Sequence, residues 1–212
     1  MPTLSDREIK ELISTKKLII TPLIADNIQP GSIDLTLGNE IDILQVHAST
    51  TVDLTKDCKD FLNTHTEKKD ISSGFELLPG QTVTGHSAEY IEMPRDVNGF
   101  ILNRNSLARI GLDAGLSQYI NPDYKGHKII QIRNNASFPI KLMPGIRICT
   151  LVLLKMGDTS DRSFDERHNT ESLTGFIEKL RKSHQDVETA KSLDKSFSDF
   201  MNRRIQELAQ GR

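Results

Sequence analysis

Residues 125–154, KGHKIIQIRNNASFPIKLMPGIRICTLVLL, decide the fold class of this chain. They contain two runs rich in Ile, Val and Leu, at 128–133 and 146–154, and a Pro-Gly pair at 144–145 interrupts the chain just before the second run. Runs of this length and composition are typical of β-strands, and Pro-Gly is typical of a tight turn. The segment therefore predicts short strands that are joined by turns.

The same pattern continues on the N-terminal side, from Leu18 up to this segment. Further apolar runs have the length of strands, at residues 18–21, 33–37, 81–84 and 99–102. Turn sequences separate them, at Gln29-Pro30-Gly31, Pro79-Gly80, Asn98-Gly99 and Lys125-Gly126. Many short strands at this spacing predict a mainly β fold, either a β-barrel or a jelly roll. Residues 49–73 are polar and charged, and we expect them to form a long excursion from the barrel.

Helical patterns occur at both ends of the chain. Ser5-Asp6-Arg7-Glu8 is typical of a capping box, and the apolar residues after it predict a short helix over residues 6–15. Apolar residues between 187 and 208 recur at three- and four-residue steps, which predicts an amphipathic helix. That helix would pack on its own barrel or on a neighbouring subunit, or it would bind a partner protein. We expect a β-barrel domain over residues 1–157, and a linker with a helical C-terminal tail over residues 158–212.

The composition excludes several classes of function. The formal net charge is −2, so a basic surface with general affinity for nucleic acid is not expected. No stretch approaches the roughly 20 apolar residues that span a bilayer, and the polar N-terminus lacks the apolar segment of a secretory signal. Cys58 and Cys149 lie far apart in the sequence and are expected to be reduced thiols. We therefore expect a cytoplasmic protein without a nucleic-acid or membrane partner.

Three ordered blocks between Leu4 and Leu154 carry motifs of one known family. They are NIQPGSIDLTLG at 27–38, GFILNRNSLARIGL at 99–112, and INPDYKG with the IIQIRN and PIKLMPG that follow it, at 120–145. These blocks resemble, in the same order, three motifs of the dCTP deaminase and dUTPase family: Gln-Pro-x-Ser-x-Asp-Leu-Arg-Leu-Gly, Gly-Arg-Ser-Ser-Leu-Ala-Arg-Leu-Gly-Leu and Ile-Asp-Pro-Gly-Tyr-x-Gly. The resemblance is closest to the dCTP deaminase branch. It implies a distorted barrel of the dUTPase type that assembles as a homotrimer.

The resemblance also implies that the chain binds a pyrimidine deoxynucleotide triphosphate. Arg104 and Ser106 match residues that hold the phosphates, which suits a guanidinium fork and a hydroxyl donor. Tyr124 matches an aromatic residue that packs on the deoxyribose, and Asn121 can contact a 3′-hydroxyl. Magnesium is expected to bind through the nucleotide phosphates and water, so no metal site made by the protein alone is predicted.

The positions that the resemblance assigns to catalysis depart from the family pattern. Hydrolytic deamination at C4 of cytosine needs a base to activate water and an acid to protonate the leaving ammonia. The family uses a Glu, a Ser and an Arg, and their places hold Gln131, Asn105 and Arg109 here. A Gln amide does not accept a proton at neutral pH. The Asp that acts as base in the dUTPase branch is likewise replaced, by Asn121.

Two nearby groups are alternative bases, Asp123 in the same turn and His127 just after it. Zinc deaminases use an H-x-E…P-C-x-x-C signature, which two distant cysteines cannot supply, so we expect a zinc-independent reaction. The preferred hypothesis is a dCTP deaminase-like enzyme of pyrimidine deoxynucleotide metabolism with a dUTP-type product. The alternatives are a catalytically impaired nucleotide sensor on the same fold and a dUTPase-type pyrophosphohydrolase.

Overall fold

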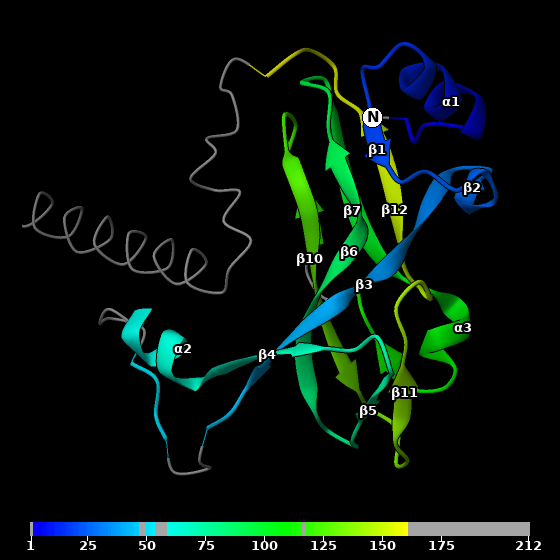
Figure 1. Cartoon of the computed structure of the whole chain (residues 1–212). Helices are drawn as coiled ribbons and strands as arrows, with labels where there is room; N and C mark the ends of the chain where they lie inside the picture. The colour runs from blue at the N-terminus through cyan, green and yellow to red at the C-terminus, as the bar shows by residue number, and fades with distance from the viewer. Residues whose placement is uncertain (1, 47–49, 54–58, 116–117, 161–212) are drawn as a thin grey trace, which may run out of the picture. The chain divides into compact units, whose positions relative to one another are not determined.

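The computed structural model describes residues 2–46, 50–53, 59–115 and 118–160 (Figure 1). The chain divides into two units, one of residues 1–46 and 65–171 and the other of residues 47–64 and 172–212. In the second unit the described part includes most of a helix, α2 (Lys59–His65). The helix predicted between residues 187 and 208 lies outside the described residues. None of the helices that the structure describes is both long and apolar enough to cross a membrane.

The first unit is mainly β, as predicted, and it begins with one helix. This helix, α1 (Asp6–Ser14), has the predicted capping box: the Ser5 hydroxyl accepts from the Glu8 amide, and the Glu8 carboxylate accepts from the Ser5 amide. Ile9 anchors the helix and is fully buried. The remaining elements follow in chain order: β1 (Ile19–Thr21), the 3₁₀ turn η1 (Ala25–Asn27), β2 (Ile28–Gln29), β3 (Ser32–Leu44), β4 (Thr66–Asp70), β5 (Phe75–Leu77), β6 (Thr82–Glu92), β7 (Val97–Asn103), α3 (Asn105–Ala108), β8 (Leu112–Asp113), β9 (Gln118–Ile120), β10 (Lys125–Asn134), β11 (Ile140–Leu142) and β12 (Arg147–Lys155).

Ten strands of the described residues form one curled antiparallel sheet, with the main order β8-β10-β6-β3-β12-β7-β9. Strands β1, β2 and β4 are side branches that pair with β6, β3 and β3. The pairing of β4 with β3 shows that the excursion predicted over 49–73 is shorter than expected, because residues 66–70 return to the sheet. The charged sequence TEKKD concealed this strand, since all but its first residue are exposed.

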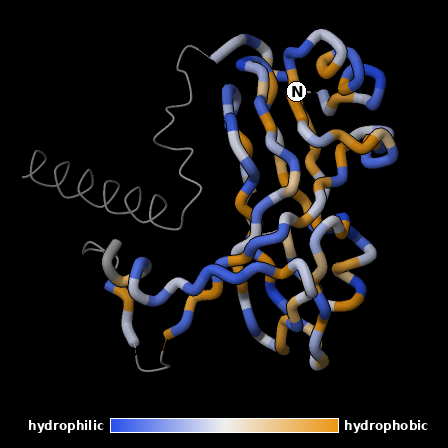
Figure 2. Tube along the Cα trace, in the orientation of Figure 1, coloured by the Kyte–Doolittle hydropathy of each residue, from blue (hydrophilic) through white to orange (hydrophobic). Residues whose placement is uncertain are grey.

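Strand β3 connects the two halves of the barrel. Its first half pairs with β12 and its second half pairs with β6 and β4. Polar and apolar residues alternate along much of the sheet (Figure 2), so one face of each strand supplies the core. The core is aliphatic and includes Ile33, Leu35, Leu37, Ile41, Ile91, Ile130, Ile132, Leu151 and Leu153.

A buried carboxylate lies where β3 separates from β6. Glu89 is only 3% exposed, and its oxygens accept hydrogen bonds from the Thr36 amide, at 2.9 and 3.1 Å, and from the Thr36 hydroxyl, at 2.7 Å. Thr36 stands where the resembled motif has an Arg. The Glu89 carboxylate therefore accepts from the Thr36 amide, which the hydrogen bonds between neighbouring strands leave unpaired.

The turn before β10 contains an unusual backbone conformation. The Tyr124 amide donates to the Asn121 carbonyl at 3.3 Å, and Asp123, inside this turn, has φ +63°. A positive φ at this position is typical of Gly, which is the residue in the resembled motif. Asp tolerates the left-handed region better than most residues do, but its Cβ still makes the conformation unfavourable.

Replacing Glu89 by Ala should destabilise the fold by about 1–3 kcal/mol, because the Thr36 amide would be left buried without an acceptor. Urea unfolding followed by circular dichroism measures the change. The matched control is Glu92→Ala on the same strand, whose Lys125 partner is 3.9 Å away and half-exposed, and it should cost at most about 0.5 kcal/mol. Equal losses of stability in the two variants would contradict the role of Glu89 as acceptor for the Thr36 amide.

Replacing Asp123 by Gly should raise the free energy of unfolding by about 0.5–1 kcal/mol. The relief of left-handed strain, about 1–2 kcal/mol, exceeds the extra backbone freedom of Gly in the unfolded chain, about 0.4–1 kcal/mol. Asp123→Ala is the control, because it keeps the Cβ and should give no gain. A Gly variant no more stable than the Ala variant would show that the turn is unstrained.

Candidate functional site

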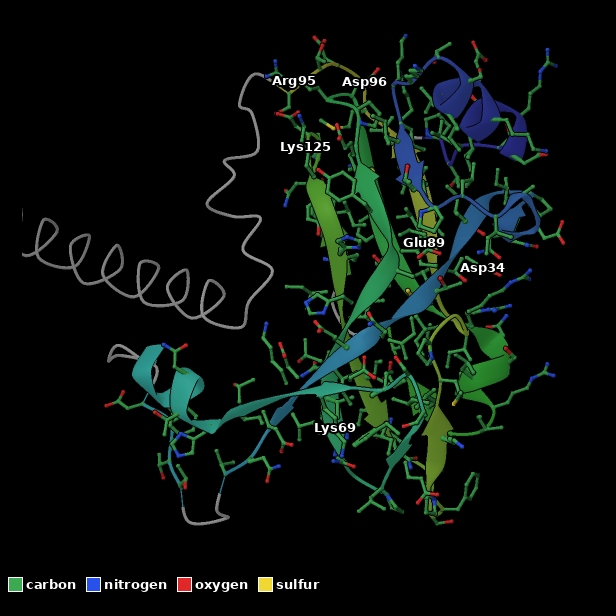
Figure 3. The ribbon with its side chains drawn as sticks, in the orientation of Figure 1. Asp34, Lys69, Glu89, Arg95, Asp96 and Lys125 are labelled. Carbon is green, nitrogen blue, oxygen red and sulfur yellow. The ribbon has the colours of Figure 1, made fainter. Side chains whose placement is uncertain are left out.

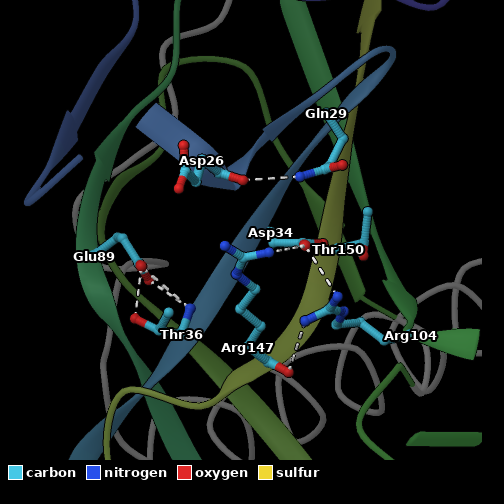
Figure 4. Close-up of polar contacts among 8 residues, drawn as sticks. All are labelled: Asp26, Gln29, Asp34, Thr36, Glu89, Arg104, Arg147 and Thr150. Atoms are coloured by element: carbon cyan, nitrogen blue, oxygen red, sulfur yellow. Dashed lines mark hydrogen bonds and ion pairs between the residues drawn. The ribbon is translucent and has the colours of Figure 1, made fainter. Parts of the chain in front are cut away.

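A buried carboxylate, Asp34 on β3, gathers two arginines (Figure 4). Its Oδ2 is 3.2 Å from Nη2 of Arg104 and 3.9 Å from Nη1 of Arg147, and its Oδ1 accepts a hydrogen bond from the Thr150 hydroxyl at 2.9 Å. Asp34 is 4% exposed, whereas the arginine side chains are 25% and 38% exposed. Two guanidinium groups on one carboxylate leave one positive charge in excess at the surface, which favours an anionic ligand.

Arg147 and Thr150 are parts of this cluster that the sequence analysis missed. Both lie on β12, and the register of β12 with β3 places Thr150 directly opposite Asp34. The sequence did offer a signal for Arg147: a charged residue inside the apolar run 146–154 needs a partner of opposite charge. The Arg147 carbonyl also accepts from Nη1 of Arg104 at 3.3 Å, which helps to orient the Arg104 side chain.

The structure brings together the predicted residues of the second block. Arg104 directly follows β7 and is the N-cap residue of α3, and its carbonyl accepts from the amides of Leu107 and Ala108. Asn105, Ser106 and Arg109 follow it within the same turn of chain, and all three are exposed. Residues four apart lie on one side of a helical turn, so Asn105 and Arg109 are neighbours. Residues 104–109 are the first predicted group of site residues, and they present hydrogen-bond donors and positive charge to solvent.

The second predicted group surrounds the turn before β10. The Tyr124 hydroxyl donates to the His127 carbonyl at 2.8 Å, so its ring lies against β10, and Nζ of Lys128 is 5.8 Å from the ring centroid. Burial lowers the pKa of the Lys128 ammonium. The turn is joined to the loop after β6, because the Tyr124 carbonyl accepts from the Met93 amide at 2.8 Å. In Figure 3, Lys125 marks this end of β10, near the labels of Arg95 and Asp96.

The ring of His127 has a defined orientation. Its Nδ1 is 3.0 Å from the carbonyl oxygen of Ser87, and a carbonyl can only accept, so Nδ1 carries the hydrogen. In the neutral ring Nε2 is then the unprotonated nitrogen, which is able to accept a proton or a hydrogen bond. His127 also lines a cleft of about 500 Å³ together with His86, Lys68 and Glu40.

The segment that follows α3 and the turn of Tyr124 meet opposite ends of β10. The amide of Asn135, just beyond β10, donates to the carbonyl of Gly111, just beyond α3, at 2.8 Å, whereas Tyr124 precedes the first residue of β10. Ten residues of strand separate the two ends, which at ~3.3 Å per residue is roughly 30 Å.

Gln131 lies on β10 between the two groups. It is exposed, and its neighbours Ile130 and Ile132 are fully buried, so its side chain points away from the core. The only cysteine among the described residues, Cys149, is a fully buried free thiol, and burial raises its pKa well above the usual range. This thiol is consequently unsuited to act as a nucleophile.

Comparison with known proteins shows the family to which the chain is related. A family model described as dCTP deaminase-like matches residues 3–156. Two similar proteins are named dCTP deaminase, dUMP-forming: that of Persephonella marina is 34% identical over 171 residues, covering 76% of this chain and 88% of the relative, and that of Nanoarchaeum equitans is 36% identical over 178 residues, covering 77% and 89%.

A solved structure shows the same fold. The 2′-deoxycytidine 5′-triphosphate deaminase from Agrobacterium tumefaciens aligns with a TM-score of 0.57 and 24% identity, over 80% of this chain and 51% of that chain. The family match covers most of the chain and includes both predicted groups of residues. This chain belongs to the dCTP deaminase-like family.

Proposed function

We propose that this chain binds dCTP and hydrolyses it to dUMP, ammonia and diphosphate. The observation that carries the proposal is the cluster of Arg104 and Arg147 on the buried carboxylate of Asp34, which holds an excess positive charge at the surface beside the donors of α3. Paired guanidinium groups in a fixed orientation suit the oxygens of a triphosphate. Ser106, exposed on the same turn, would add a hydroxyl donor.

The product is inferred from the relatives. Both relatives are named dUMP-forming, whereas the sequence analysis expected a dUTP-type product. Formation of dUMP consumes two waters, one at C4 of the base and one at the phosphate chain. His127 is proposed to accept a proton in the second step, because its Nε2 is unprotonated in the neutral ring and the residue adjoins the turn of Asn121 and Tyr124.

Magnesium is proposed to bind through the phosphates of the nucleotide and through water. Among the residues that the structure describes, no group of three or more His, Cys, Asp and Glu side chains is placed to hold a metal ion. The chain's own contribution to the triphosphate is therefore assigned to Arg104, Arg147 and Ser106.

A second candidate function is binding of the nucleotide without turnover. The observation that favours it is that amides, Gln131 and Asn121, stand where the family has proton-accepting carboxylates. An amide keeps the shape and the hydrogen bonds of the carboxylate but loses its basicity. The chain would then act as a nucleotide sensor.

The site is proposed to be completed by assembly as a homotrimer. The segment after α3 and the turn of Tyr124 meet opposite ends of β10, so a neighbouring copy of the chain would bring its own residues to a nucleotide held beside Arg104. An apolar face is available for such contacts: Phe100, Leu102 and Tyr119 point outward from β7 and β9 and are 42%, 50% and 42% exposed. The Phe100 and Tyr119 rings pack edge to face, with centroids 5.3 Å apart.

Incubation of the chain with dCTP and magnesium should release ammonia and diphosphate in equal amounts. Arg104→Ala should weaken dCTP binding roughly 10- to 100-fold, because a charge-assisted contact contributes about 1.5–3 kcal/mol. Arg7→Ala, which removes an exposed arginine from α1, is the control and should bind normally. Ammonia without diphosphate would make the product dUTP, binding without either would favour the sensor, and no binding would exclude both functions.

Replacing Phe100 by Asp should convert the assembly to monomers and abolish turnover, since a charge on this face would be buried without a partner. Size-exclusion chromatography with light scattering measures the mass. Phe138→Asp is the control, because Phe138 is also exposed, at 52%, but lies in the loop before β11. A monomeric unaltered chain that still turns over dCTP would contradict the shared site.

A further inference from the structure

A row of polar side chains crosses the outer face of the sheet at Gln131. On one side Gln131 pairs directly with Thr84 of β6, and Thr84 pairs directly with Asp42 of β3. Side chains of directly opposed residues point to the same face of a sheet. The next pairs along, which include Ile130 and Ile41, face the core and are fully buried. The side chains of Asp42, Thr84 and Gln131 therefore lie together on the outside.

The environment of Asp42 is unusual for a residue on an outer face. Asp42 is only 9% exposed, yet its carboxylate makes no hydrogen bond or ion pair with any other residue that the structure describes. Lys68 is its direct partner on β4, but the two charges are not within ion-pair distance. Among the described side chains only Thr66 Oγ1 and Asn98 Oδ1 are buried without a hydrogen-bond partner, so the Asp42 oxygens still reach solvent and can contact a water there.

We propose that Asp42 supplies the proton acceptor that position 131 has lost. This inference rests on the proposed deamination of dCTP. Adjacent strands are about 4.8 Å apart, so the Cα atoms of Asp42 and Gln131 are separated by roughly 10 Å, with Thr84 midway. Both side chains can reach the space over Thr84. A water there is held by the Gln131 amide and the Thr84 hydroxyl and lies next to the Asp42 carboxylate.

The proton balance of the reaction can be met by this one carboxylate. As the water oxygen bonds to C4 of cytosine, one water proton passes to Asp42 and from there to ring N3. Asp42 then takes the proton of the new C4 hydroxyl and gives it to the amino group. The C4–N4 bond breaks, ammonia leaves, and C4 becomes a carbonyl. Asp42 ends as the carboxylate, and Gln131 only orients the water.

Other titratable groups are less well placed for this step. Asp123 precedes β10 and is eight residues from Gln131, and the His127 ring is directed to the Ser87 carbonyl on β6. Glu40 lies on the same strand as Asp42, but it is exposed and lies within the register shift that interrupts the pairing of β3 with β6. Among the carboxylates of the described residues, Asp42 is the one that shares a row with Gln131.

The test measures ammonia release and dCTP affinity in the full-length chain and three variants. Asp42→Asn should lower the rate of ammonia release at least ~100-fold, which is the usual contribution of a general base, while the Kd for dCTP stays unchanged. Asp42→Asn with Gln131→Glu should restore release, because it returns a carboxylate to the family position. Glu76→Gln, at an exposed carboxylate on β5 outside the site, is the matched control and should keep the rate of the unaltered chain. If Asp42→Asn does not fold, judged by circular dichroism, Asp42→Ser replaces it.

The outcomes separate this inference from the proposed function. If Asp42→Asn releases ammonia as fast as the unaltered chain, or if the double variant stays inactive while binding dCTP, Asp42 is not the base and the deaminase assignment stands. If the unaltered chain binds dCTP but releases no ammonia, the proposed deamination fails, and the role of Asp42 is overturned with it.

Discussion

The buried ion pair between Asp34 and Arg104 joins the longest strand of the barrel to the segment that presents the predicted phosphate-binding residues. A carboxylate that is almost fully buried needs charge partners and hydrogen bonds, and here they come from α3's N-cap residue and from β12. The arrangement of the site follows from this requirement. Because Arg104 and Arg147 both have to reach one carboxylate, their guanidinium groups are held close together, and the excess positive charge faces solvent.

A second buried carboxylate, Glu89, has a different role. It lies where β3 changes partners from β12 to β6 and accepts from a backbone amide that neither ladder reaches. Close by, the register of β3 and β6 shifts between Leu37 and Ile41, and the cleft that His127 lines lies over this irregular stretch. Gly38 fits there because a Cβ at this position would lie 3.1 Å from the His86 carbonyl oxygen. The polar and hollowed parts of the barrel thus concentrate where its regular pairing is interrupted.

The chemistry of the proposed site depends on where its carboxylates lie relative to the resembled motifs. At the two positions where the resembled motifs have proton-accepting carboxylates, this chain has amides, Gln131 and Asn121. The family relationship is nevertheless clear over residues 3–156, and the relatives that cover most of the chain share one named activity. The outer row that includes Asp42 reconciles these observations, because a sheet can supply a functional group from a neighbouring strand at nearly the same place. In the proposed mechanism Gln131 keeps the shape of the family residue and Asp42 provides the basicity.

Local sequence determined much of this protein. The capping box specified α1, the short apolar runs and Pro-Gly turns specified a mainly β fold, and the ordered motifs specified the family and the turn that carries Arg104, Asn105, Ser106 and Arg109. The charged strand β4 escaped detection, because a strand that is exposed on both faces has no apolar period to detect.

Only the tertiary structure decided which residues meet across the sheet. Thr150 lies 116 residues from Asp34 in sequence and yet bonds to it, and Asp42, Thr84 and Gln131 come from three strands. The two-residue period of a strand tells which face a side chain is on, but the partner strand and the register are set by long-range packing. Sequence therefore predicted the turns that are proposed to bind nucleotide, and the fold determined which charges lie beside them.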